Sequence, residues 1–343
     1  MKKNLIALAV LAASGVAMAQ SSVTLYGVAD AWIGQTSNTD AAGLKVKQTK
    51  IDSGGFNGSR WGLKGSEDLG GGMKAIFTLE SGFDIDTGAG SKDGLFNRQA
   101  FVGLQGGFGA VTLGRQYTAY DELRGATNQA YDTAFATTGG VWANGIDDYA
   151  DRANNSIAYT SPSFGGVSGA VVLGLGENKA GGLKATKNYS AHIKYANGPV
   201  LVGYAHQVQN IRNDAVAATV TPLAAAIPAS NTEEIKYNLL AGSYDFGVAA
   251  LTGGYNDVKQ GNAKDKEYQV GVSVPFGAAS VALGYAHSKS DVAGVTTKAE
   301  GYSLTGLYDL SKRTRLYAGL NNVKQKESSE KSSLFAVGVR HSF

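Results

Sequence analysis

The chain has 343 residues, of which 43% are hydrophobic and 17% charged, and its formal net charge is +3. Its 47 glycines, about twice the ordinary usage, and 17 tyrosines against three methionines favour β structure over helices. The absence of cysteine excludes a disulfide framework, a thiolate metal site and a cysteine nucleophile. The nearly balanced charge excludes a strongly basic nucleic-acid binder. Four scattered histidines offer no metal-binding spacing, so we expect no metal and no cofactor.

The first 19 residues differ from the rest of the chain. Two lysines, Lys2 and Lys3, precede an apolar run from Leu5 to Leu11, and residues 17–19 (AMA) form a cleavage site of small residues. This pattern predicts a secretory signal peptide over residues 1–19, with a buried N-terminal helix as the alternative. No later stretch approaches the ~20 consecutive apolar residues of a membrane helix. The remaining residues, 20–343, are therefore either a soluble secreted β protein or an outer-membrane β-barrel.

Apolar residues alternate with small or polar ones along many segments. Val23, Leu25 and Gly27 share one face of the first such segment, and Thr24 and Tyr26 share the other. The segments 268–276 and 335–343 alternate in the same way. A soluble sandwich needs large residues in its core, whereas small apolar side chains suffice against lipid. The pattern therefore favours a barrel with its apolar face outward and its polar face toward water.

Sixteen such segments are predicted to be strands. Short turns rich in Gly, Asn, Asp and Pro alternate with longer polar connections, of which the longest span about 117–151 and 209–234. Short periplasmic turns and long outer loops are typical of outer-membrane barrels. We predict an all-β fold, a transmembrane antiparallel 16-stranded β-barrel wide enough for an aqueous channel. The strands are centred near Leu25, Trp61, Phe77, Val102, Val111, Ile157, Val171, Ile193, Val202, Leu239, Leu251, Val270, Val281, Leu304, Leu316 and Val337.

Several motifs resemble one known family. The segment 59–83 (SRWGLKGSEDLGGGMKAIFTLESGF) resembles the signature block of the general diffusion porins of Gram-negative outer membranes, of the β-proteobacterial type. The segments 22–27, 97–104 and 112–116 resemble the family's first strand and two later ones. The terminal Phe343 resembles the C-terminal aromatic that acts as an assembly signal. The resemblance covers the whole mature chain and is most specific in its first hundred residues.

The resemblance implies a homotrimer of barrels in the outer membrane, in contact with membrane lipid and lipopolysaccharide. Each barrel would have its own pore for small hydrophilic solutes and inorganic ions. The third outer loop, about 117–151, would fold inward and narrow that pore. Selectivity would then depend on the width and on the electric field at the narrowest point.

The positive side of the constriction is predicted from strand residues. Trp61 and Leu63 would face lipid, so Arg60 and Lys64 would face the lumen. The same alternation turns Arg152 inward, because a charge on the lipid face at mid-membrane costs roughly 2–4 kcal/mol. The alternation around Arg98 is ambiguous, and the family motif places an arginine of the constriction there. The alternative for each is a rim position that contacts lipopolysaccharide phosphate.

The negative side is predicted from the long loop. It contains six acids, and Asp121, Glu122 and Asp132 in its first half are our candidates for the constriction. The alternative is that they are ordinary solvated loop charges. Arg115 shares the parity of outward-facing residues, so we expect a subunit-contact or rim residue.

The predicted function is a passive, water-filled outer-membrane channel with a weak preference for anions, because several strand cations converge on one wall. The sequence contains no supported catalytic constellation and no phosphate-binding loop, so we do not expect an enzyme. One alternative is a substrate-specific channel for a sugar, phosphate or carboxylate. The other alternative is a protein of a different class, either a barrel enzyme or a soluble secreted adhesin.

Overall fold

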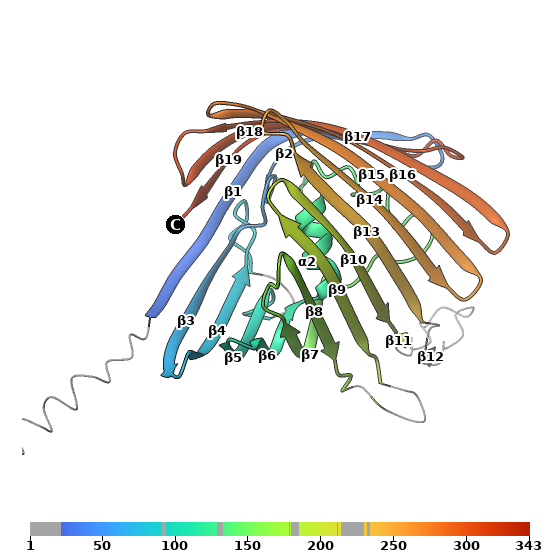
Figure 1. Cartoon of the computed structure of the whole chain (residues 1–343). Coiled ribbons are helices and arrows are strands. Elements are labelled where there is room, and N and C mark those ends of the chain that lie inside the picture. Colours follow the sequence, from blue (N-terminus) through green and yellow to red (C-terminus); the bar gives the residue numbers. More distant parts are fainter. Residues whose placement is uncertain are drawn as a thin grey trace, which may run out of the picture.

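The computed structural model is a closed barrel of antiparallel strands (Figure 1). The structure describes residues 22–90, 94–128, 133–177, 179, 185–210, 212–213, 230–231 and 234–343. The predicted signal peptide lies outside these residues. Seventeen strands form the main sheet, and the first pairs with the last. Because β2 and β3 both pair with β1, one after the other, they share one position in the wall, which therefore has sixteen.

The elements follow the chain in order. The first half of the wall contains β1 (Ser22–Thr39), β2 (Lys45–Ser53), β3 (Arg60–Gly70), β4 (Met73–Gly82), β5 (Gln99–Gly106), β6 (Gly109–Tyr117), β7 (Arg152–Thr160) and β8 (Val167–Gly174). The second half contains β9 (Asn188–Asn197), β10 (Val200–Gln209), β13 (Ile235–Asp245), β14 (Ala250–Gln260), β15 (Ala263–Phe276), β16 (Ala279–Val292), β17 (Val295–Asp309), β18 (Thr314–Gln325) and β19 (Lys331–Ser342). The pair β11 (Arg212–Asn213) and β12 (Ser230–Asn231) lies between β10 and β13. The helix α2 (Ala119–Thr127) follows β6.

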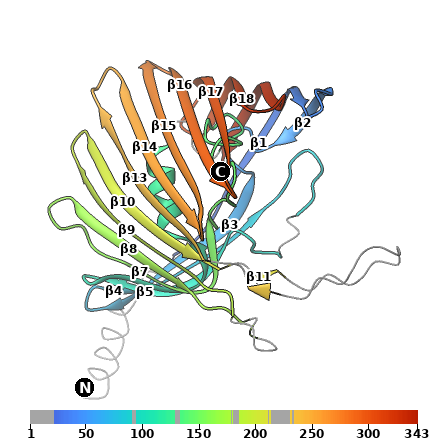
Figure 2. The ribbon, with the colours of Figure 1, turned by 90° about the vertical axis from the view of Figure 1, so that its right-hand side faces the viewer.

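The predicted fold class and number of wall strands are confirmed, but the expected long outer connections are partly wrong. Between β14 and β15 the chain turns over two residues, Gly261 and Asn262, and between β16 and β17 over Ala293 and Gly294. Ala293 and Gly294 both have positive φ, as a tight two-residue hairpin requires. The polar residues that indicated loops instead extend the strands, because strand pairing satisfies the backbone whatever the side chains are. Figure 2 shows these long strands side by side.

The outer surface of the wall carries the large apolar side chains. Leu25, Val102, Ile193, Leu283 and Val337 are each at least 43% exposed, and they come from strands all around the barrel. An apolar surface of this extent is unsuited to water, and it matches the lipid-facing band of a membrane barrel. In the part of the chain that the structure describes, no helix is long and apolar enough to cross a membrane.

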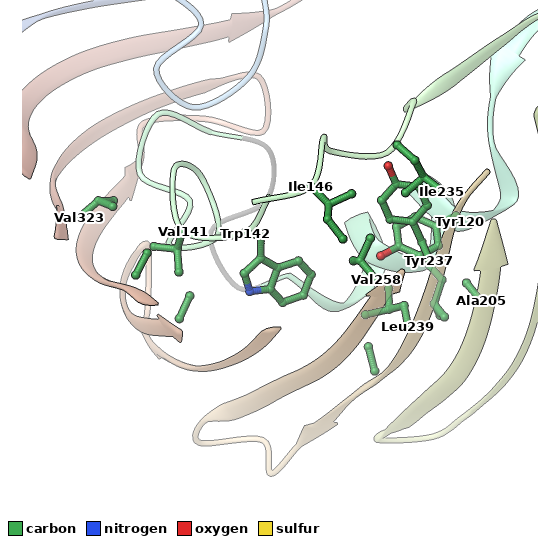
Figure 3. Packing of buried hydrophobic residues seen from close by; sticks show 14 residues of the cluster. Tyr120, Val141, Trp142, Ile146, Ala205, Ile235, Tyr237, Leu239, Val258 and Val323 are labelled. Atoms are coloured by element: carbon green, nitrogen blue, oxygen red, sulfur yellow. The ribbon is translucent and has the colours of Figure 1, made fainter. Parts of the chain in front are cut away.

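The segment between β6 and β7 lies inside the barrel and packs on its inner wall. Its helix α2 begins after Thr118, whose hydroxyl accepts a hydrogen bond from the Asp121 amide. Tyr120, Trp142 and Ile146 pack against wall residues that include Tyr237 and Leu239 (Figure 3). This apolar contact fills part of the lumen beside β10 and β13–β18. A polar cavity lies on the other side of the segment.

Candidate functional site

A polar cavity of about 1150 Å³ lies between the internal segment and the wall of β3–β7. It is lined by backbone from the glycine-rich stretch before β3, by strand ends and by the inner segment. Seven of its lining residues are charged: Arg60, Arg98, Arg124, Arg152, Asp84, Asp148 and Asp151. No group of histidine, aspartate or glutamate side chains among the described residues has the arrangement of a metal site.

Glu80 on β4 anchors two of the wall arginines. Its side chain is 5% exposed. One carboxylate oxygen lies 2.7 Å from Nε of Arg98, and the other lies 3.5 Å from Nε of Arg60. The Tyr26 hydroxyl donates a third bond, of 3.0 Å, to the same carboxylate. These contacts hold both guanidinium groups at the cavity surface and partly neutralise them.

Tyr117, the last residue of β6, joins two arginines. Its hydroxyl oxygen accepts hydrogen bonds of 2.7 Å from Arg98 and from Arg152. The guanidinium of Arg152 also lies 4.3 Å from the centre of the tyrosine ring. Arg152 pairs with Asp151 at 2.5 Å, and that carboxylate is half exposed to water. Two cationic groups, one just before β5 and one at the start of β7, are therefore both bonded to the Tyr117 hydroxyl oxygen.

The loop contributes a fourth guanidinium. Arg124 lies in the last turn of α2, 4.6 Å from the ring centre of Tyr149 and 5.2 Å from that of Trp142. Asp148 lies 3.5 Å from it and is 53% exposed. The loop side of the cavity therefore carries both a cation and a carboxylate.

The structure brings together three of the four predicted basic residues. Arg60, Arg98 and Arg152 line this one cavity. Lys64 shares the inward face of Arg60, but it lies four residues further along β3, about 13 Å away. Its ammonium group sits 5.2 Å above the ring of Tyr26 and does not line the cavity.

The predicted acids lie elsewhere. Asp121 is buried and accepts a 2.6 Å hydrogen bond from the Tyr149 hydroxyl. Glu122 points toward the β9 wall, 3.8 Å from His192. Both acids occupy the first turn of a helix, where the backbone amides favour negative charge. Asp132 lies outside the described residues. Two of the three acids at the cavity, Asp148 and Asp151, come from the second half of the loop, and the third, Asp84, follows β4. Helix formation in the first half of the loop is the reason for the difference.

Glu122 has an altered acidity. Burial beside the wall raises the pKa of its carboxyl, and the positive charge of Lys194 opposes that rise. The side chain is still 42% exposed. Its charge therefore acts on the β9 side of the helix and not on the cavity.

Two further predicted residues lie on the wall. Arg115 shares the face of Leu113 and donates a 2.5 Å hydrogen bond to the Asn97 carbonyl, outside the cavity lining. Phe343 exchanges two backbone hydrogen bonds with Gly27, of 3.0 and 3.1 Å, and so closes the barrel seam.

Sequence reasoning missed Glu80, Tyr117 and Arg124. Glu80 could have been found from alternation, because Phe77 and Leu79 point outward and an acid then falls on the lumen face. Tyr117 ends a strand and Arg124 depends on the helix, which Thr118 followed by Asp121 and Glu122 would have indicated.

Taken together, a closed barrel with an apolar exterior and a charged, water-accessible passage defines a transmembrane pore. The cavity lining includes both guanidinium groups and carboxylates.

Comparisons with known proteins agree. The model of the Gram-negative porin family matches residues 6–328. Outer membrane porin protein 32 of Delftia acidovorans is 37% identical, and an outer membrane porin protein of Bordetella pertussis is 32% identical, each over 100% of both chains. The solved structure of an anion-selective porin from Comamonas acidovorans is 30% identical, with a TM-score of 0.79, over 94% of this chain and 100% of that one.

The chain belongs to the Gram-negative porin family. It is a passive channel of the outer membrane and not an enzyme. The resemblance seen in its first hundred residues is thereby confirmed.

Proposed function

We propose that this channel passes small hydrophilic solutes and inorganic ions with a weak preference for anions. The preference would arise at the constriction, from the guanidinium groups of Arg60, Arg98, Arg124 and Arg152. The observation that carries this proposal is their convergence on one cavity with only three carboxylates in its lining. The similarity to a porin named as anion-selective supports the same sign.

The negative side of the constriction is assigned to Asp148 and Asp151. Both carboxylates are about half exposed, and each is paired with an arginine of the cavity. Opposite charges held in a water-filled passage create a field across it, which orients dipolar solutes. The loop 117–151 would thus set both the width and the field of the pore.

Charge reversal at Arg98 tests the proposal. An ion about 4 Å from a unit charge in water-like surroundings changes its energy by ~1 kcal/mol. Arg98→Glu changes the charge by two units, or ~2 kcal/mol, so we expect the chloride-to-potassium permeability ratio to fall by about thirtyfold. Reversal potentials in a salt gradient across a planar bilayer measure this ratio. A cation-selective wild-type channel would refute the preference, and an unchanged variant would remove Arg98 from the ion path.

We also propose the remaining features that the sequence predicts. Residues 1–19 would be a cleaved signal peptide, and N-terminal sequencing of the mature protein should then begin at Gln20. The protein would be a homotrimer, supported by the small outward-facing residues Ala29 and Ala31 on β1, with Arg115 as a subunit-contact or rim residue. Chemical cross-linking in detergent should give a trimer band that persists on boiling, whereas the trimer without cross-links should dissociate. Phe343 would act as the assembly signal, and the outer surface would contact lipid and lipopolysaccharide.

A further inference from the structure

A second cationic cavity lies at the end of the barrel where β1 begins and β19 ends. It has a volume of about 240 Å³ and shares no lining residue with the large cavity. The turn between β17 and β18 forms much of it. Its lining comprises Asp309, Ser311, Lys312, Arg313, Thr314, Arg315 and Arg340, so four cations surround one carboxylate.

The charges of this cavity form part of a row across four strands. Arg340 on β19 is directly opposite Arg315 on β18 and Asp30 on β1. Arg315 is in turn opposite Asp309 on β17. Two like charges directly opposite each other on one face of a sheet repel. The row therefore places two guanidinium groups next to each other, with one carboxylate at each end.

Both carboxylates of the row are already occupied. Asp309 binds Arg315 through two hydrogen bonds of 2.6 and 2.9 Å. Asp30 accepts bonds from the backbone amides of Gly55, Phe56 and Asn57 and from the Tyr317 hydroxyl. These bonds tie Asp30 to the inner turn before β3. Because of these bonds, neither carboxylate has much remaining capacity to accept hydrogen bonds from Arg340.

Arg340 itself lacks a full set of partners. Its Nε atom is buried and has no hydrogen-bond partner among the described residues. Its direct cross-strand neighbour on β18, Arg315, is another cation. A cation in such surroundings is stabilised by an anion that accepts hydrogen bonds from it.

The turn supplies further donors. Lys312 and Arg313 add two exposed cations at the edge of the cavity. The Ser311 oxygen accepts hydrogen bonds from the backbone amides of Arg313 and Thr314, which leaves its proton free to be donated outward. At ~30 Å³ for each water molecule, the cavity has room for a small oxyanion with a few waters.

We propose that this cavity is a second anion-binding site, which takes small phosphate- or carboxylate-type dianions at the periplasmic mouth of the channel. Arg340 and Arg313 are its principal ligands, and Lys312 and Ser311 complete it. This proposal rests on the proposed conduction of anions. It adds a second binding site to the anion path, on the periplasmic side of the constriction. Anions that leave the constriction would be held there before release, and anions in the periplasm would be concentrated at that mouth.

Chloride currents through the full-length channel test the site. Inorganic phosphate, and succinate in a parallel series, are added to one side of a planar bilayer at a time. We expect the wild type to be inhibited at lower concentration from the side of the β17–β18 turn. Replacing Arg313→Gln and Arg340→Gln together should raise the half-inhibiting phosphate concentration by about tenfold, because two charge-assisted contacts are lost. Inhibition by phosphate but not by succinate would indicate a site for phosphate. Inhibition by both anions would indicate a site for dianions in general.

Matched variants keep the outcome clear. Lys331→Gln removes a cation from the opposite end of β19 and should leave the inhibition unchanged. Arg313→Gln alone lies in an exposed turn, and it keeps the test valid if the double variant does not fold, which heat-modifiable gel migration reveals. Two results would overturn the site. One is phosphate inhibition of equal strength from both sides of the bilayer. The other is a half-inhibiting phosphate concentration that stays at the wild-type value in Arg313→Gln and in the folded double variant.

Crystals soaked in selenate give a second measurement. An anomalous peak beside Arg340 is expected, and peaks confined to the constriction would overturn the site. A cation-selective wild type that still binds selenate beside Arg340 would refute the proposed anion preference while leaving the site intact. The two proposals therefore fail in different experiments.

Discussion

Tyr117 and Glu80 show how single residues hold the arginines of the polar cavity in place. Like-charged arginines would move apart unless a shared partner held them, and each of these two residues is bonded to two arginines. Hydrogen bonds to charged groups contribute about 1.5–3 kcal/mol each. Glu80 also cancels part of the charge that it positions. The strength of the positive field therefore depends on a carboxylate that lies behind the cavity surface.

Replacing Glu80→Gln should increase the anion preference. The amide keeps much of the side-chain shape, but it leaves Arg60 and Arg98 without the neutralising charge. One unit of charge near the ion path corresponds to ~1 kcal/mol, so we expect the chloride-to-potassium permeability ratio to rise about fivefold. Reversal potentials measure the change. Glu67→Gln, at an exposed position of β3, is the control, and an equal shift in both variants would contradict a local effect.

At the scale of elements, the inner segment is held by acids of the wall. Asp265, fully buried on β15, accepts hydrogen bonds from the amides of Gly145 and Ile146, at 3.3 and 3.0 Å. Glu267 on the same strand accepts one of 2.6 Å from Ala143. Apolar packing of Trp142 and its neighbours does not by itself fix the orientation of the segment, whereas these directional hydrogen bonds do. They fix how far the loop reaches across the lumen.

Removing these acceptors should loosen the loop. In Asp265→Ala with Glu267→Ala, three loop amides lose their charged acceptors, each worth about 1.5–3 kcal/mol. We expect a noisier open-channel current and faster proteolytic cleavage within residues 141–148, while the barrel still forms. Single-channel recording and limited proteolysis check this. The control is Asp40→Ala in the exposed β1–β2 hairpin, where the carboxylate accepts a hydrogen bond from the Leu44 amide of its own turn. A quiet, resistant double variant would mean that packing alone holds the loop.

For the whole molecule, the seam between β1 and β19 completes the barrel. Gly27 is needed there because a Cβ atom would lie 2.2 Å from the ring of Phe343 and 2.7 Å from the Arg60 carbonyl oxygen. Backbone cannot move away without opening the pairing on both sides of β1. Closure removes the exposed strand edges that would otherwise invite aggregation.

Gly27→Val should therefore impair closure. Overpacking of this kind costs about 1–3 kcal/mol, and here it falls on the seam itself. We expect a smaller heat-modifiable fraction after refolding in detergent, measured by gel migration with and without boiling. Gly107→Ala serves as the control, since a Cβ there has no neighbour within 4 Å. Refolding of both variants to the same extent would show that the seam tolerates the side chain.

The sequence by itself determined the barrel and its orientation. Alternation with a period of two fixes which side chains face lipid, because charged groups on that face carry a large free-energy cost. It therefore placed Arg60 and Arg152 on the inner face. On β13 this reasoning fails, since Ile235, Tyr237 and Leu239 are apolar and yet point inward, while Leu240 points outward.

The family resemblance predicted that the loop 117–151 folds inward, but only the tertiary structure decided how that loop packs in the lumen. The apolar inner face of β13 has meaning once Tyr120, Trp142 and Ile146 are packed on it. That packing fixes where α2 and the chain after it lie, so that Arg124 and Asp148 line the cavity. Asp121 is instead bonded to Tyr149, and Glu122 lies beside His192 of β9. Contacts between residues more than a hundred positions apart carry no local pattern. Which acids of the loop line the cavity therefore depends on how the loop packs inside the folded barrel.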